Sequence, residues 1–165
     1  MDMKKLVTFA ALGVALATAG CSKTADGPVK REAGKWATEV KVEKLDIEGI
    51  PPEIKAQMEQ QMKTTRTFEE CLTAEQAAKE DIAGDMSKAS GSGGCTWKKN
   101  SVADGKIDIA GTCNGAAGPS ELAMTGTLAA KNTDVTITMK SKSPTGGNME
   151  VVMHATGKHV GACTT

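Results

Sequence analysis

Four cysteines restrict the fold of this chain more than any other sequence feature: Cys71, Cys95, Cys113 and Cys163. Two of them, Cys95 and Cys113, lie on short alternating segments that flank a turn at residues 103–105. When this hairpin is folded symmetrically, Cys95 stands opposite Cys113. Trp97 then stands opposite Gly111, where the indole can cover the bare glycine backbone. The register therefore predicts a disulfide between Cys95 and Cys113.

The other two cysteines are then left to pair with each other. A disulfide between Cys71 and Cys163 would tie an early strand to the C-terminus, and it would contribute about 4–5 kcal/mol in the chain-entropy model. The alternative is a four-cysteine zinc site, which favours close pairs such as Cys-x-x-Cys. Successive cysteines here are 24, 18 and 50 residues apart. We therefore expect two disulfides, no metal and no other cofactor.

The N-terminus indicates the oxidising compartment in which disulfides persist. Lys4 and Lys5 precede an apolar run at residues 6–20 that ends in small residues, which is the pattern of a bacterial secretory signal. The run has 15 residues, fewer than the roughly 20 that a membrane-spanning helix needs. We therefore expect residues 1–20 to be a signal peptide.

Two cleavage positions compete at the end of this signal. Cys21 directly follows Ala19 and Gly20, which resembles a lipobox, where the cysteine is lipidated and becomes the mature N-terminus. A plain secretory signal would instead be cut after the small residues 17–19. Lipidation of Cys21 leaves an even number of cysteines, and Ser22 is not the Asp that retains lipoproteins in the inner membrane. We therefore expect palmitate and other acyl chains to anchor the protein on the periplasmic side of the outer membrane.

Composition excludes some classes of partner. Without residues 1–20 the chain has 18 basic and 19 acidic side chains, so it has no basic field that would attract nucleic acid. The aromatic residues that remain are Trp36, Phe68 and Trp97, too few for base-stacking or sugar-binding platforms. The core must come from Val, Ile, Leu and Met, and disulfides would support so modest a core.

Alternating apolar residues predict a single β-rich domain at residues 34–165, behind a lipidated N-terminus and polar tether at residues 21–33. The main expected strands are residues 36–47, 64–71, 95–99, 107–113, 122–128, 135–139 and 149–155, and residues 160–163 end the chain. A bend is expected near Lys44. A turn at residues 131–132 would pair Leu128 with Val135, so that both apolar sets face the same side. The fold class is mainly β: an antiparallel meander of about seven or eight strands that forms a barrel or a strongly curved sheet.

Two short helices are expected between the strands. The first begins at residues 51–52 and carries an apolar stripe formed by Ile54, Met58 and Met62. This stripe either packs on the sheet or, if exposed, marks a contact with a partner or a membrane surface. A capping box at residues 73–76 begins the second helix, which extends to about Ile82. Residues 87–94, rich in Ser and Gly, are interpreted as a flexible loop.

Several short motifs are spread over residues 29–163: Gly34-x-Trp36, Cys71-Leu72-Thr73-x-x-Gln76-Ala77, Cys95, Cys113 and Gly161-Ala162-Cys163. Together they resemble the proteobacterial secreted proteins and lipoproteins grouped as a domain of unknown function, number thirty-six seventeen. This resemblance supplies a family without an activity. Gly-x-Trp on a first strand is also similar, at the level of the fold alone, to lipocalins. That similarity implies that Trp36 is a core residue or plugs one end of a barrel.

No set of residues predicts catalysis. His154 is expected to face solvent, and a metal site that used His154 and His159 would need a distant third ligand. The carboxylates at residues 69–70 and 80–81 lie on expected polar faces and are interpreted as solvated charge. Disulfides would consume the remaining thiols, and the sequence contains no Gly-x-Ser-x-Gly motif.

We therefore expect a non-enzymatic, lipid-anchored β domain that faces the periplasm and binds a small apolar ligand or a partner protein. One alternative is an envelope-maintenance protein that acts only through protein–protein contact, and another is an unrecognised hydrolase. Methionine side chains are adaptable walls for an apolar ligand, although a Met-rich face is also typical of a core. A wide cavity lined by Met, Val and Ile would favour ligand binding. A filled barrel with an exposed apolar patch would favour the partner.

Overall fold

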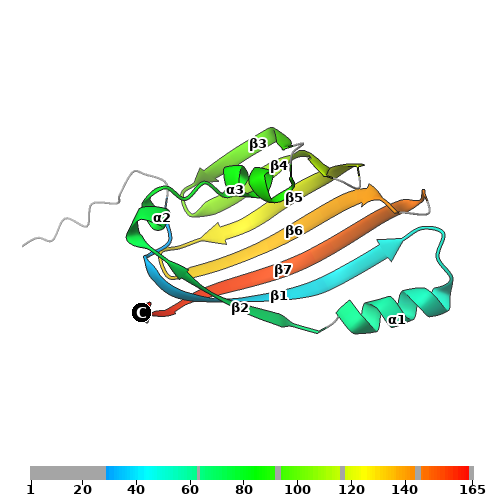
Figure 1. Cartoon of the computed structure of the whole chain (residues 1–165), viewed down its shortest axis with the longest axis horizontal. Helices are drawn as coiled ribbons and strands as arrows, with labels where there is room; N and C mark the ends of the chain where they lie inside the picture. The colour runs from blue at the N-terminus through cyan, green and yellow to red at the C-terminus, as the bar shows by residue number, and fades with distance from the viewer. Residues whose placement is uncertain (1–28, 63, 92–93, 116–117, 144–145, 164–165) are drawn as a thin grey trace, which may run out of the picture.

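Alternating residues build a single antiparallel sheet in the computed structural model, which describes residues 29–62, 64–91, 94–115, 118–143 and 146–163. The strands are β1 (Gly34–Ile47), β2 (Arg66–Leu72), β3 (Cys95–Ala103), β4 (Lys106–Gly115), β5 (Gly118–Leu128), β6 (Asn132–Lys142) and β7 (Asn148–Gly161). Their spatial order is β2-β1-β7-β6-β5-β4-β3. Strands β3 to β7 therefore form a meander, and β1 lies between β7 and β2 (Figure 1). The predicted signal peptide at residues 1–20 and the predicted lipidation of Cys21 lie outside the described residues.

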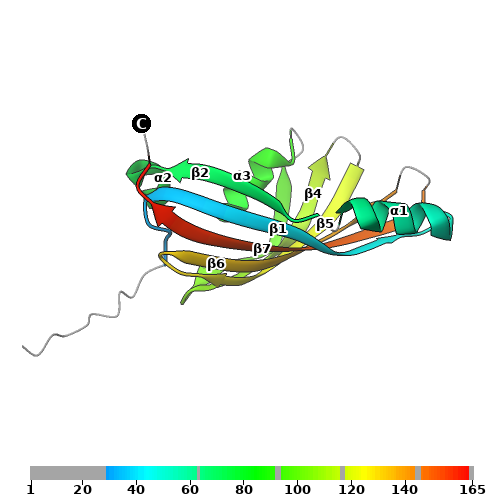
Figure 2. The same cartoon turned by 90° about the horizontal axis from the view of Figure 1, so that it is seen from below.

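The sheet is curved and does not close into a barrel. Figure 2 shows β4 and β5 rising steeply from the direction of β1 and β7. Strands β2 and β3 are the two edges of the sheet, and they do not pair with each other. Strand β2 is short and pairs only with Gly34–Val40 of β1. The prediction of a mainly β meander is therefore confirmed in its curved-sheet form, and the barrel form is wrong.

The strand register separates apolar from polar side chains. One row across β4, β5, β6, β7 and β1 consists of Ile109, Met124, Ile137, Met153 and Val42. The adjoining row on the same side contains Leu122, Met139, Val151 and Leu45. The residues that alternate with these two rows point to the other side of the sheet, and they include Ala110, Ala123, Thr138 and Val152. We call the side with the first two rows the apolar face and the other side, which is rich in Thr and charged residues, the polar face.

Three short helices lie against parts of the apolar face: α1 (Pro52–Met62), α2 (Ala74–Ala78) and α3 (Ile82–Ala89). Helix α1 places Met58 and Met62 against a cluster around Leu45 and Val151. Helix α3 places Ile82, Ala83 and Met86 against a cluster around Ile109 and Met124. The apolar stripe of α1 therefore packs on the sheet, although Ile54 is 47% exposed.

No helix among the described residues has the length and apolar character needed to cross a membrane.

The second predicted helix ends earlier than expected, and a separate helix, α3, follows it. Thr73 and Gln76 form the predicted capping box at the start of α2. The helix ends at Ala78, and Asp81 begins α3 by accepting a hydrogen bond from the backbone N–H of Gly84 at 3.0 Å. Residues 87–89, expected to belong to a flexible loop, lie in α3. The loop prediction was wrong there because residues 87–89 contain no Gly, and packing of the preceding turn on the sheet outweighs the weak local helix preference of Ser87.

Both predicted disulfides are present, Cys71–Cys163 and Cys95–Cys113. The β3–β4 turn uses Asp104 and Gly105, whose φ angles of 51° and 69° suit a two-residue hairpin turn. A bulge between Trp97 and Lys99 shifts the register by one residue, so that Cys95 still faces Cys113 and Trp97 still faces Gly111. The bend that was predicted near Lys44 of β1 is also observed, as a shift in register.

The predicted pairing of β5 with β6 is wrong by two residues. Leu128 pairs with Thr133, whereas Val135 pairs with Gly126. The difference arises because the turn is centred one residue earlier than expected, with the backbone N–H of Ala129 bonded to the carbonyl of Asn132 at 2.8 Å. A shift of two residues preserves the side-chain face, so the apolar sets still lie on one side of the sheet.

We expect the Cys71–Cys163 disulfide to contribute more stability than the Cys95–Cys113 disulfide. The paired cysteines are separated by 92 and 18 residues, which correspond to about 4–5 and about 3 kcal/mol in the chain-entropy model. Denaturant unfolding should therefore show the larger loss of free energy for the Cys71→Ala/Cys163→Ala variant than for the Cys95→Ala/Cys113→Ala variant. The reverse order would contradict this assignment.

Candidate functional site

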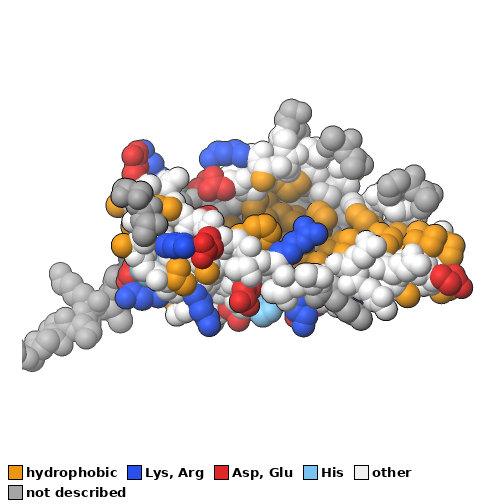
Figure 3. All heavy atoms as spheres, turned by 60° about the horizontal axis from the view of Figure 1, so that its bottom comes forward, with side chains coloured by type: hydrophobic (Ala, Val, Ile, Leu, Met, Phe, Trp, Pro, Cys, Tyr) orange, Lys and Arg blue, Asp and Glu red, His pale blue; other side chains and the backbone are white. Residues whose placement is uncertain are grey.

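The apolar face is hollowed where the helices leave it uncovered. Figure 3 shows hydrophobic side chains gathered along a hollow that extends toward the end of the molecule where α1 lies. Leu122, Ile137, Met139 and Met153 in the central rows are only half-buried. The small helices therefore cover the two ends of the apolar rows and leave their middle accessible.

A cavity of about 340 Å³ lies on this face beside α3. Its sheet side is formed by Ile107, Met124, Leu128, Thr133, Val135 and Ala155. Ile82 of α3 forms part of the opposite wall, and Phe68 on the edge strand β2, which is 54% exposed, forms part of the rim. The cavity thus has an apolar floor and an aromatic side chain at its entrance.

Charged side chains gather at one end of this cavity. The Arg31 guanidinium donates from Nε to Glu80 Oε1 at 2.7 Å and from Nη1 to Glu70 Oε1 at 2.6 Å. Its Nη2 forms an ion pair with Glu80 Oε1 at 2.6 Å. Arg31 also lies 5.0 Å from the centre of the Trp36 ring, which is a favourable place for a cation. Burial alone would lower the pKa of Arg31, but the hydrogen bonds with Glu80 and Glu70 outweigh it and raise the pKa. The guanidinium therefore remains charged in this half-buried position.

The Glu80 side chain corrects a sequence interpretation. Residues 80–81 were interpreted as solvated charge, whereas the Glu80 side chain is only 10% exposed. Its Oε2 atom is buried and has no hydrogen-bond partner among the described residues. Glu80 lies in the short connection between the end of α2 and the start of α3, where the chain turns toward the apolar face. The other acidic pair lies at the surface, where Glu69 bonds with Lys35 and Glu70 with Arg31.

Trp36 fills the end of the apolar face next to α2. It is fully buried, packs with Leu72 and Ala77, and donates from its indole nitrogen to the Glu32 carbonyl at 2.9 Å. An open sheet has no lumen to plug, so the barrel that the lipocalin similarity implied for this residue is absent. Trp36 instead closes one end of the hydrophobic layer and supports Arg31.

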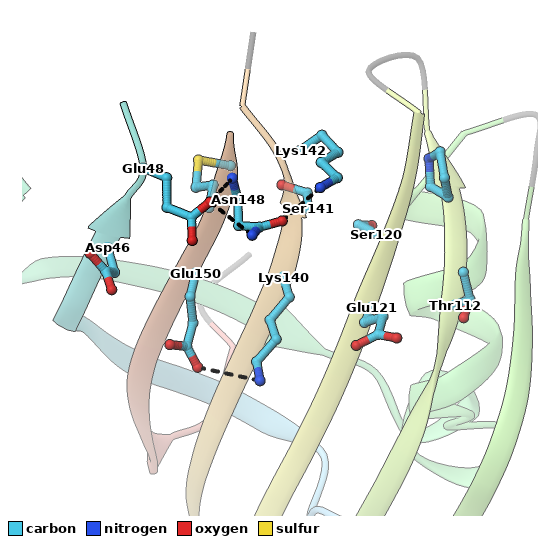
Figure 4. Close-up of a pocket in the computed structure, with 12 residues that line it drawn as sticks. Asp46, Glu48, Thr112, Ser120, Glu121, Lys140, Ser141, Lys142, Asn148 and Glu150 are labelled. Carbon is cyan, nitrogen blue, oxygen red and sulfur yellow. Dashed lines mark hydrogen bonds and ion pairs between the residues drawn. The ribbon is translucent and has the colours of Figure 1, made fainter. Parts of the chain in front are cut away.

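A larger cavity, about 620 Å³, lies elsewhere and is polar. It forms where β5 and β6 separate, since their pairing stops at Glu121 and Lys140. Figure 4 shows that its charged groups bond with neighbours, with Asn148 donating to Glu48 Oε2 at 2.8 Å and Lys140 3.7 Å from Glu150. Hydrogen bonds from the backbone and side chain of Asn148 lower the pKa of Glu48. We interpret this notch as a solvated strand end, because its charged side chains lie at the surface and most of them bond with neighbouring side chains.

The two histidines lie apart from both cavities. His154 is on the polar face, as predicted, and its Nε2 is 2.8 Å from Asp134 Oδ1. His159 contacts the edge of Trp36, and its Nε2 is 3.1 Å from the Ala33 carbonyl. Among the residues that the structure describes, no group of three or more His, Cys, Asp or Glu is arranged to hold a metal ion.

Comparison with protein families gives one match, over residues 31–163. The matching family is described as "Protein of unknown function (DUF3617)". No curated protein and no solved structure matches the chain. The matched range begins at Arg31, includes all seven strands and ends at Cys163. The resemblance inferred from the cysteine framework is thereby confirmed, and the chain belongs to the DUF3617 family.

Proposed function

We propose that this protein binds a single apolar chain, such as the hydrocarbon chain of a lipid, along the apolar face of its sheet. The observation that carries this proposal is the recessed apolar cavity between the sheet, α3 and Phe68. Its volume of about 340 Å³ lies within the range of roughly 300–1,000 Å³ that is common for small-molecule sites. The half-buried Met139 and Met153 continue the apolar floor toward α1.

The energetics favour such an occupant. Burial of hydrocarbon contributes about 0.8 kcal/mol per methylene, so a chain of about ten methylenes would gain roughly 8 kcal/mol before the cost of ordering it. Methionine side chains adapt to chains of different shape. A small recess of this kind suits an extended hydrocarbon chain better than it suits the broad surface of a folded partner protein. Among the described residues, the exposed large hydrophobics Ile54, Phe68 and Val160 belong to separate elements, which gives a partner protein less to bind.

We propose that binding occurs without chemical change to the ligand. The titratable side chains that line the apolar cavity are Arg31, Glu70 and Glu80. Arg31 holds both carboxylates in hydrogen bonds. The residues that line the cavity include no Ser, Cys, His or Lys. This arrangement supports a binding role over the hydrolase alternative.

The proposed location is based on the N-terminal residues and on the disulfides. We propose that the protein is exported and held by lipid at Cys21 on the periplasmic side of the outer membrane. The signal-like residues 6–20 support export. All four other cysteines form disulfides, which persist in oxidising compartments. Lipidation of Cys21 would then leave no free thiol.

Filling the cavity should abolish binding. Ala155 lies on its floor, whereas its neighbour Thr156 lies on the polar face opposite Asp134. In titrations with a fluorescent naphthylamine probe, we expect Ala155→Trp to raise the Kd at least about tenfold, or 1.4 kcal/mol. We expect the matched variant Thr156→Trp to stay within about twofold of the parent protein.

A milder variant, Ala155→Leu, should weaken binding of the probe to an intermediate degree. Circular dichroism would confirm that each variant is folded. Equal Kd values for the two tryptophan variants would show that the probe binds elsewhere, and the proposed site would then be abandoned.

Lipidation is tested separately by metabolic labelling with palmitate. We expect the label to be incorporated into the parent protein and lost in Cys21→Ser, because the acyl chains attach to that cysteine. The adjacent variant Ser22→Ala should retain the label. Persistence of the label in Cys21→Ser would end the lipoprotein proposal without affecting the proposed cavity.

A further inference from the structure

The carboxylate of Glu80 lacks part of its hydrogen bonding. The hydrogen bond and the ion pair from Arg31 both end on Oε1, and Oε2 is buried without a partner among the described residues. A buried polar oxygen without a donor costs about 1–3 kcal/mol, and more when it is charged. Such an atom indicates that a donor outside the described residues, such as a bound ligand, completes the site.

Glu80 stands at the junction of two cavities. It lines the apolar cavity, and it also lines a neighbouring cavity of about 260 Å³ that includes Val29, Lys30 and Asn100. Ile82 and Leu128 border both cavities as well. A chain lying on the apolar floor would therefore place its end beside the Glu80 side chain, whose carboxylate carries the unpartnered oxygen.

The charges around this junction favour a cation over an anion. The charged side chains that line the two cavities are Lys30, Arg31, Glu70, Glu80 and Asp81. Two are positive and three are negative, which leaves a formal charge of −1. Arg31 is occupied by Glu80 and Glu70, and Lys30 is bonded to the Ala78 carbonyl. A carboxylate or phosphate would thus meet an uncompensated negative charge, whereas an ammonium group would neutralise it.

We propose that the apolar chain bound by this protein carries a cationic, hydrogen-bond-donating head group of the primary amine type, which donates to Oε2 of Glu80. This inference rests on the proposed function, since it specifies the head group of the same ligand. The hydrocarbon supplies most of the affinity, and Glu80 selects among head groups.

The test compares three probes with the same chain: dodecylamine, dodecanol and dodecanoate. Displacement of the fluorescent probe would give their Kd values for the parent protein at neutral pH. We expect dodecylamine to bind at least about tenfold more tightly than dodecanoate, or 1.4 kcal/mol, with dodecanol between them. In Glu80→Gln the amine and the alcohol should agree within about twofold, while the Kd of dodecanol should remain unchanged.

The matched control is Glu75→Gln, which removes an exposed carboxylate of α2 that pairs with Lys79 outside both cavities. It should retain the full preference for the amine. If Glu80→Gln fails to fold, the comparison of the three probes with the parent protein still decides the question.

The possible failures are distinguishable. If the parent protein binds the amine no more tightly than the alcohol, or if Glu75→Gln abolishes the preference as Glu80→Gln does, the head-group inference is overturned and the apolar-chain proposal survives. If none of the three compounds displaces the probe, the proposed function itself fails.

Discussion

A single sheet with one apolar face must bury that face against something, and this requirement governs the whole molecule. Stable domains meet it with a second sheet, a closed barrel or a layer of helices. Here the apolar rows extend across β4, β5, β6, β7 and β1. The helices available to cover them have 11, 5 and 8 residues. The covering layer is therefore incomplete, and the hollow on the apolar face is the direct consequence.

Two disulfides hold the edges of this open sheet. Cys95–Cys113 joins the edge strand β3 to its neighbour β4. Cys71 and Gly161 both pair with Lys35 of β1, so the Cys71–Cys163 bond spans β1 and ties the other edge to the chain end after β7. Neither edge depends on closing against the other for its stability. The framework can thus keep a cavity open that a closed barrel of the same strands would fill with side chains.

The sequence predicted the features that depend on local patterns. The Asp104–Gly105 turn and the cysteine positions were enough to place both disulfides, and alternation was enough to assign the apolar face. The register of β5 against β6 was missed by two residues because residues 129–132 offer no Gly or Pro to fix the turn. Helix α3 was missed because its Ser and Gly residues resemble a loop when its packing on the sheet is unknown.

The charged end of the cavity was not accessible to sequence reasoning. Arg31 and Glu80 are 49 residues apart, and each lies in a polar stretch that has no periodicity of its own. Their pairing depends on the chain passing back over the apolar face between α2 and α3. The only local sign was Asp81, which caps the start of α3 after α2 has ended at Ala78. Burial of Glu80 follows from that break.

The most direct test is methyl NMR of the protein with a spin-labelled long-chain alcohol, whose neutral head group makes the result independent of Glu80. An apolar chain on the proposed face should broaden the methyl signals of Met124, Val135 and Ile137. The methyl signals of Val152, on the polar face of the same sheet, lie farther from the chain and should be broadened less. Broadening of Val152 with sharp signals from the other three would contradict the account.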